Sequence, residues 1–229
     1  MTTRTVTRTA KFAVGFDGHR SVDLKGRDGL WARLDCVQED LTRAANDLIE
    51  VLSMVNRDII SWPMNGDKKV PLATLAYRAL IGAWTPWGRP IYRPEGRTVS
   101  GGVKSALAGS VLARLLEDGR ARQKDKTRPR YSTFGSQPIP FRKQEVRFLL
   151  DGRIRLTIWA SGARRAAPLV VRPAGVRGGQ ETILRRIRKG EYKHGDGKLW
   201  KDAKTRKWMF AVSWTGPVVA AEGDLVAGV

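Results

Sequence analysis

The sequence predicts an α+β protein in which a β unit, built from both ends of the chain, is interrupted by a helical block. Apolar and polar residues alternate over Thr5–Phe16, which is the pattern of a half-buried strand. Helical patterns fill the chain from Leu30 to Leu116. Short strand-like runs joined by turn residues follow Tyr131. Strands at both ends and helices between them favour one sheet with a helical insertion.

The N-terminal strand needs a partner, because its apolar residues, among them Val6, Phe12 and Phe16, require a sheet that buries them. A lone strand beside helices would leave backbone groups unpaired, at about 1–3 kcal/mol for each buried one. Closing a long loop costs only about 0.6 kcal/mol per doubling of its length. We therefore expect this strand to pair with the strands that follow Tyr131.

Three helices are predicted in the block. The first runs from Leu30 to Ile59 and ends at Trp62-Pro63, because the residue before proline is pushed out of the helical region. The second is expected over Pro71–Trp84, and the third over Val103–Leu116, with Gly119 as its C-cap. The loop that follows Trp84 contains aromatic residues, which could stack on bases or fill a gap between helices.

The region after Tyr131 is predicted to be mostly β, with one helix. Asp151-Gly152 between two apolar-rich runs predicts a hairpin. The remaining predicted elements are strands at Tyr131–Phe134, Val146–Leu150 and Arg153–Ala160, a helix at Glu181–Lys189 capped by Gly190, and a hairpin of Leu199–Trp200 with Trp208–Trp214 that turns around Asp202–Thr205.

The charge of the chain is large and localised. The 229 residues include 42 Lys and Arg against 22 Asp and Glu, a formal net charge of +20. Residues 1–119 carry +4 of it, residues 120–215 carry +18, and the tail carries −2. A basic surplus of this size makes a polyanion the expected partner.

Several functional classes lack support in the sequence. Cys36 is the only cysteine, which excludes an internal disulfide and fits a reducing, cytoplasmic compartment. No signal-peptide pattern and no apolar run of about 18 residues occurs, so no membrane partner is expected. His19, His194 and Cys36 show no metal-ligand spacing, and no G-x-S-x-G nucleophile motif is present. We therefore predict no catalytic or metal-binding residue in this chain.

Nucleic-acid binding is better supported, because basic side chains gather in three places that could contact phosphates. The first is the run 120–130. The second is one sheet face of the hairpin, from which Arg147, Arg153 and Arg155 are expected to project at alternating positions. The third is the exposed arc of the helix Glu181–Lys189, which is expected to be covered by Arg185, Arg186, Arg188 and Lys189. The run 120–130 contains no apolar residue larger than alanine, and a solvated linker is its alternative role. An acidic membrane is the competing polyanion, but the segment Glu181–Lys189 has too few large apolar residues to insert. The candidate contact residues are Arg120, Arg122, Lys124, Lys126, Arg128, Arg130, Arg142, Lys143, Arg147, Arg153, Arg155, Arg185, Arg186, Arg188, Lys189 and Lys193.

The order of features from Tyr131 onward resembles the N-terminal half of type V CRISPR effectors and their transposon-encoded TnpB-type relatives. The resemblance implies a wedge domain, an oligonucleotide-binding-type β-barrel that grips the guide RNA and is split by an inserted helical recognition lobe. It implies wedge segments at residues 1–27 and 131–222, a recognition lobe at 28–119 and a basic linker at 120–130. The segments that carry it are Ser136–Phe141, Phe148–Trp159, Ile183–Lys193 and Arg206–Val212.

The last residues, 223–229, are similar to the strand that leads into the RuvC nuclease of that family, where a catalytic aspartate follows. That aspartate and the later RuvC carboxylates are absent from the sequence. The expectation is a truncated gene product, or a protein that works with a partner supplying the rest. The chain itself is then not an enzyme, and magnesium would act only if a RuvC domain were supplied.

The resemblance therefore implies a protein that binds guide RNA, without a cofactor of its own, and helps to recognise target DNA. Two alternatives remain open. One is a free-standing RNA-binding protein unrelated to CRISPR, and the other is a subunit completed by a separate chain that contains RuvC.

Overall fold

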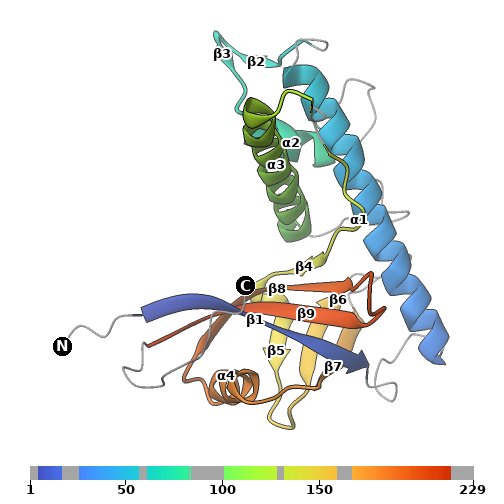
Figure 1. Ribbon diagram of the computed structural model, residues 1–229, viewed down its shortest axis with the longest axis vertical. Coiled ribbons are helices and arrows are strands. Elements are labelled where there is room, and N and C mark those ends of the chain that lie inside the picture. The colour runs from blue at the N-terminus through green and yellow to red at the C-terminus, as the bar shows by residue number, and fades with distance from the viewer. Residues whose placement is uncertain are drawn as a thin grey trace. The chain divides into compact units, whose positions relative to one another are not determined.

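A computed structural model describes residues 5–16, 26–56, 61–81, 83, 101–127, 132–158 and 167–217. Two compact units make up the chain. The barrel unit comprises Met1–Leu30, Pro140–Trp159 and Arg165–Val229, and the helical unit comprises Trp31–Ile139 and Ala160–Arg164. Figure 1 shows the strands of the first unit and the long helices of the second.

Seven strands form one sheet that curls into a nearly closed barrel, in the order β4-β8-β9-β1-β7-β6-β5 (Figure 1). From β8 to β5 all neighbours run antiparallel. One helix, α4 (Gly179–Arg188), and one 3-10 turn, η1 (Lys143–Glu145), belong to the same unit. The strands are β1 (Thr5–Phe16), β4 (Ile139–Phe141), β5 (Val146–Phe148), β6 (Ile154–Ile158), β7 (Ala167–Ala174), β8 (Lys193–Lys201) and β9 (Trp208–Pro217).

The N-terminal strand β1 lies in the middle of this sheet. Its residues Thr5–Ala13 pair with β9, and Ala13–Phe16 pair with β7. The prediction that this strand pairs with strands from beyond Tyr131 is therefore confirmed. The predicted hairpins are confirmed as well, since β5 pairs with β6 and β8 pairs with β9.

Strand β5, at one edge of the sheet, and β8, next to the other edge, approach each other near η1. Phe148 of β5 lies with its ring centroid 5.2 Å from that of His194 on β8. The carboxylate of Asp196, also on β8, accepts hydrogen bonds from the Arg142 guanidinium at 3.0 Å and from the Lys143 backbone N–H at 2.9 Å. These contacts bring β5 and β8 together and curl the sheet into its barrel.

The barrel core is aromatic at its centre. The Phe210 ring lies 5.9 Å from Phe12 and 6.5 Å from Phe141, measured between centroids. Burial along β9 alternates residue by residue, as expected for a strand with one face inside. Gly197 permits this packing, because a Cβ there would lie 2.7 Å from Cζ of Phe210. Leu184 and Ile187 of α4 are buried too.

Strand β7 was not predicted from the sequence. Its run contains Pro168 and Pro173, and proline, which has no N–H to donate, argues against a central strand. The pairing of Val171 with Ile154 on one side and with Phe16 on the other places it inside the sheet nonetheless. Tertiary pairing has overridden the local preference.

The described residues of the helical unit form three helices and a small hairpin. The apolar side of α1 is buried, as are Leu75 and Leu80 of α2 and Val111 of α3, and α2 packs against α3. The hairpin turns at Gly66-Asp67, where Gly66 has a φ of 60°. The elements are α1 (Gly26–Asn56), β2 (Met64–Asn65), β3 (Lys68–Lys69), α2 (Leu72–Ile81) and α3 (Gly101–Lys124).

Two predictions about this unit are wrong. Helix α3 does not end at Gly119 but continues to Lys124, because glycine costs only about 1 kcal/mol within a helix and the following Arg, Ala, Gln and Lys residues favour one. The described residues of Tyr131–Phe134 form no strand. Asn46 of α1 instead accepts from the Phe134 N–H at 2.7 Å and donates to its carbonyl at 3.1 Å, which replaces a neighbouring strand.

Some predictions fall outside the described residues. These are the loop Trp84–Pro90, the end of the first helix at 57–60 and the tail 223–229. Within the part of the chain that the structure describes, no helix combines the length and the apolar character needed to cross a membrane.

Candidate nucleic-acid interface

Nearly all of the described positive surplus lies in the barrel unit. Its described residues include 20 Lys and Arg against 7 Asp and Glu, whereas those of the helical unit include 11 against 9. The prediction from the sequence placed the surplus in 120–215 as one block. The structure divides that block, because the basic residues up to Lys126 lie in the helical unit.

The basic run is therefore not a linker over its described length. Arg120, Arg122 and Lys124 form the last turns of α3, and Lys126 follows in a turn. Cations at this end suit the partial negative charge of a helix C-terminus. Acidic residues accompany them: Asp118 accepts hydrogen bonds from Ser132, and Asp125 from Thr127. Arg128 and Arg130 lie outside the described residues.

The hairpin of β5 and β6 holds the clearest cluster of predicted cations. Arg147 and Arg155 are directly opposite each other in the register, and both are exposed. Like charges at opposed positions destabilise a sheet unless a counter-charge is present. The nearest acid in the turn, Asp151, is paired with Arg153. Two arginines thus present positive charge side by side on one sheet face.

Arg153 differs from these two. Its side chain is only 15 % exposed, and its Nε donates to Asp151 at 2.7 Å. This hydrogen bond, together with one from the Arg153 backbone N–H, lowers the pKa of Asp151 to about 2. The prediction that Arg153 projects with Arg147 and Arg155 is wrong, because Asp151 holds it in the turn.

This pairing predicts an acid-sensitive hairpin turn. The folded pKa of Asp151 lies below the unfolded value of about 3.9, so the carboxylate stabilises the fold fully above about pH 4, and the contribution is lost as pH falls through about 2. In Arg153→Gln the pKa of Asp151, followed by NMR, should rise toward its ordinary range. The control is Asp202, whose pKa is lowered chiefly by hydrogen bonds from Thr205 and should stay lowered. An unchanged Asp151 pKa in this variant would contradict the assignment.

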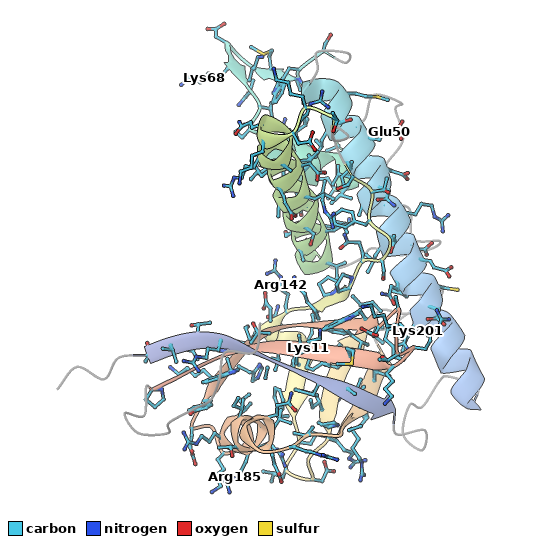
Figure 2. All side chains as sticks on the ribbon, viewed as in Figure 1. Lys11, Glu50, Lys68, Arg142, Arg185 and Lys201 are labelled. Carbon is cyan, nitrogen blue, oxygen red and sulfur yellow. The ribbon has the colours of Figure 1, made fainter. Side chains whose placement is uncertain are left out.

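Helix α4 presents two of its four predicted cations freely. Arg185 and Lys189 are exposed, and Figure 2 shows Arg185 directed away from the sheet. Arg186 is only 21 % exposed and donates from Nη1 to the Tyr192 hydroxyl at 2.6 Å. Arg188 is half-buried and donates from Nε to the Leu184 carbonyl at 3.2 Å. The prediction that all four cover the exposed arc is therefore wrong for Arg186 and Arg188.

The remaining predicted residues flank β8. Lys193 is exposed at its start, and Lys143 is exposed in η1. Arg142 is engaged by Asp196, at 3.0 Å between Nη1 and Oδ2. The exposed predicted cations of the barrel unit are therefore Lys143, Arg147, Arg155, Arg185, Lys189 and Lys193.

The residues of the barrel unit that were missed from the sequence include three that lie in neighbouring rows of β1, β9 and β8, namely Lys11, Lys198 and Trp200. Lys11 and Lys198 are exposed on β1 and β8, and Lys11 Nζ lies over the Trp200 ring, 5.2 Å from its centroid. The alternation in Thr5–Phe16 placed Lys11 on the polar side of its strand. Its neighbours could not be found without the pairing of β1, β9 and β8.

The described residues contain no cluster of three or more His, Cys, Asp or Glu that could hold a metal ion. The arrangement is suited to binding. Exposed arginine and lysine side chains on a rigid sheet can make charge-assisted hydrogen bonds to phosphate oxygens.

No protein-family model matches the chain, and no curated protein matches it. Among solved structures, the chain is similar to one in the cryo-EM structure of the Cas12f1-sgRNA-target DNA complex, with 12% sequence identity and a TM-score of 0.48. The similarity covers 93% of this chain and 59% of that one, so this chain spans about three fifths of that protein. The case for function rests on the chain's own residues.

Proposed function

We propose that this chain is the guide-RNA-binding and target-DNA-recognition portion of an RNA-guided effector, and that its barrel unit supplies the principal RNA contacts. The observation that carries the proposal is the opposed pair Arg147 and Arg155 on a unit with 20 basic and 7 acidic described residues. A sheet face that places like charges opposite each other is favoured when phosphate groups lie between or beside them.

The guide-RNA part of the proposal is supported by the order of motifs and by the chain topology. A barrel whose central strand β1 comes from one end of the chain, and whose other strands come from beyond the helices, has the split arrangement that the type V resemblance implies. In that class, base pairing with the guide supplies sequence specificity, and the protein holds the backbone. The helical unit then corresponds to the recognition lobe.

The test is to purify the chain from its native cells, sequence the RNA bound to it, and measure capture of single-stranded DNA by the complex. We expect one dominant structured RNA, and at least about tenfold better capture of DNA complementary to its variable part than of scrambled DNA. Affinity for the RNA should fall steeply as the salt concentration rises, because the Lys and Arg side chains that contact phosphates release the counterions condensed on the RNA.

Two results would count against the proposal in different ways. A salt-sensitive RNA affinity without any preference for complementary DNA would favour a free-standing RNA-binding protein. A flat salt dependence of RNA affinity would contradict the proposal that the basic barrel unit binds RNA. An isolated helical unit that binds RNA as well as the whole chain would contradict it too.

The proposal also gives an expectation for catalysis. With bound RNA, complementary DNA and magnesium, the chain alone should leave the DNA uncut, because paired carboxylates are needed to hold catalytic metal ions. A gel assay with labelled DNA measures this, and adding a separate RuvC-containing chain tests for completion in trans. Reproducible cleavage by this chain alone, abolished by replacing one of its own carboxylates, would show that it is a nuclease.

A further inference from the structure

The outward face of β8, β9 and β1 is organised in rows that cross the three strands. Register places Lys193, Thr215 and Thr7 in one row, and Lys198, Ala211 and Lys11 in another. Ser213 and Thr9 lie opposite each other between these rows. A last row contains Trp200, Met209 and Ala13. We call this surface the hydroxyl face, after Thr7, Thr9, Ser213 and Thr215.

Its middle is rich in hydroxyl groups. The hydroxyls of Thr7 and Thr215 lie 2.9 Å apart, and Thr7 and Thr9 are exposed. Ser213 donates to the Asp196 carbonyl at 3.2 Å. Side chains this short allow another backbone to approach the sheet closely, and each hydroxyl can both donate and accept a hydrogen bond.

The charge on this face is of one sign. Lys11, Lys193 and Lys198 are exposed, whereas β1 and β9 contain no Asp or Glu. The acid of β8, Asp196, is held by Arg142 and Lys143. Asp202, in the turn beyond Trp200, accepts hydrogen bonds from Lys204 and Thr205. The charge complementarity is therefore with a polyanion.

We propose that the hydroxyl face binds the sugar–phosphate backbone of RNA and distinguishes RNA from DNA through Thr7, Thr9 and Thr215. The inference rests on the proposed function and adds to it the residues that select the ribose. The lysines contact phosphates, and the threonine hydroxyls exchange hydrogen bonds with 2′-hydroxyl groups. Trp200, already paired with Lys11, offers a ring at one end on which a base stacks.

The chemistry of the face favours ribose. The 2′-hydroxyl is both a donor and an acceptor, and it is the group by which a protein tells RNA from DNA. Lysines alone would bind both nucleic acids alike, since phosphate contacts carry no such information. A face with lysines only at its margins and hydroxyls between them combines the two functions. Three strands about 4.8 Å apart span about 10 Å, wide enough for one strand of backbone.

The test compares two variants of the full chain for binding RNA and DNA of one sequence and secondary structure. The first, Thr7→Val/Thr9→Val/Thr215→Val, removes hydroxyls but keeps the charge and the β-branched shape that suits a strand. We expect its preference for RNA over DNA to fall about tenfold, with the salt dependence unchanged. The second, Lys11→Gln/Lys198→Gln, should weaken RNA and DNA binding alike and make the salt slope shallower by about 2.

The matched control is Thr74→Val/Thr127→Val/Thr133→Val, which removes three exposed hydroxyls of the helical unit and should leave the preference unchanged. If the triple variant does not fold, Thr9→Val alone should still lower the preference, by about threefold. An unchanged RNA preference in a folded hydroxyl variant overturns the inference while leaving RNA binding by the barrel intact. Absence of RNA binding by the unaltered chain overturns the proposed function itself, so the two failures are distinguishable.

Discussion

Deleting residues 1–16 should unfold the barrel unit and leave the helical unit folded. This segment contains β1, which joins β9 to β7 in the middle of the sheet, so its loss divides the sheet in two. It also removes Phe12 and Val14, which are buried in the barrel core. Hydrogen exchange should show loss of protection over β6–β9, with protection retained over α1–α3.

A pair of point variants keeps this prediction quantitative. Phe12→Ala should cost about 3–5 kcal/mol, because a large buried ring leaves a cavity. Thr9→Ala, on the exposed side of the same strand, should change the free energy of unfolding by no more than about 0.5 kcal/mol. Unfolding of the helical unit with an intact barrel, after the deletion, would contradict the split arrangement.

Neutralising four exposed cations of the barrel should weaken RNA binding far more than neutralising four of the helical unit. The barrel variant replaces Arg147, Arg155, Arg185 and Lys189 with Gln. At about 0.1 M salt we expect an affinity loss on the order of a hundredfold, and a salt slope shallower by about 3 to 4. Fluorescence anisotropy over a series of salt concentrations measures both quantities.

The control changes the net charge by the same amount, through Arg78, Arg120, Lys124 and Lys126, each replaced with Gln. Three acidic residues, Glu117, Asp118 and Asp125, are close in sequence to Arg120, Lys124 and Lys126. The positive electrostatic potential around these three cations is therefore weaker. We expect the slope to change by no more than about 1. Equal losses in the two variants would mean that binding follows net charge and not the barrel surface.

The positions of some predicted contact residues were correct and those of others were wrong, and the difference has a physical cause. Arg147 and Arg155 were placed correctly on one face, because hairpin geometry follows from the Asp151-Gly152 turn. Arg153 and Arg186 were misjudged, because their partners Asp151 and Tyr192 engage them through geometry that residue type does not encode. A basic residue in a sequence has charge, but its availability depends on its neighbours.

The sequence by itself determined the α+β class, the hairpins, the helix α4 and the need of β1 for a distant partner. These follow from alternation, helical periodicity and turn residues, which act over a few positions. Only the tertiary structure decided the order of strands, the place of the proline-containing β7, and the loop at Phe134 that Asn46 holds. It also decided which cations stay exposed and which rows form the hydroxyl face. The strand order, the place of β7 and the rows of the hydroxyl face depend on contacts between residues far apart in the chain, and local patterns carry no information about such contacts. The exposure of a cation depends on side-chain geometry even where its partner is near in the sequence, as Asp151 is to Arg153.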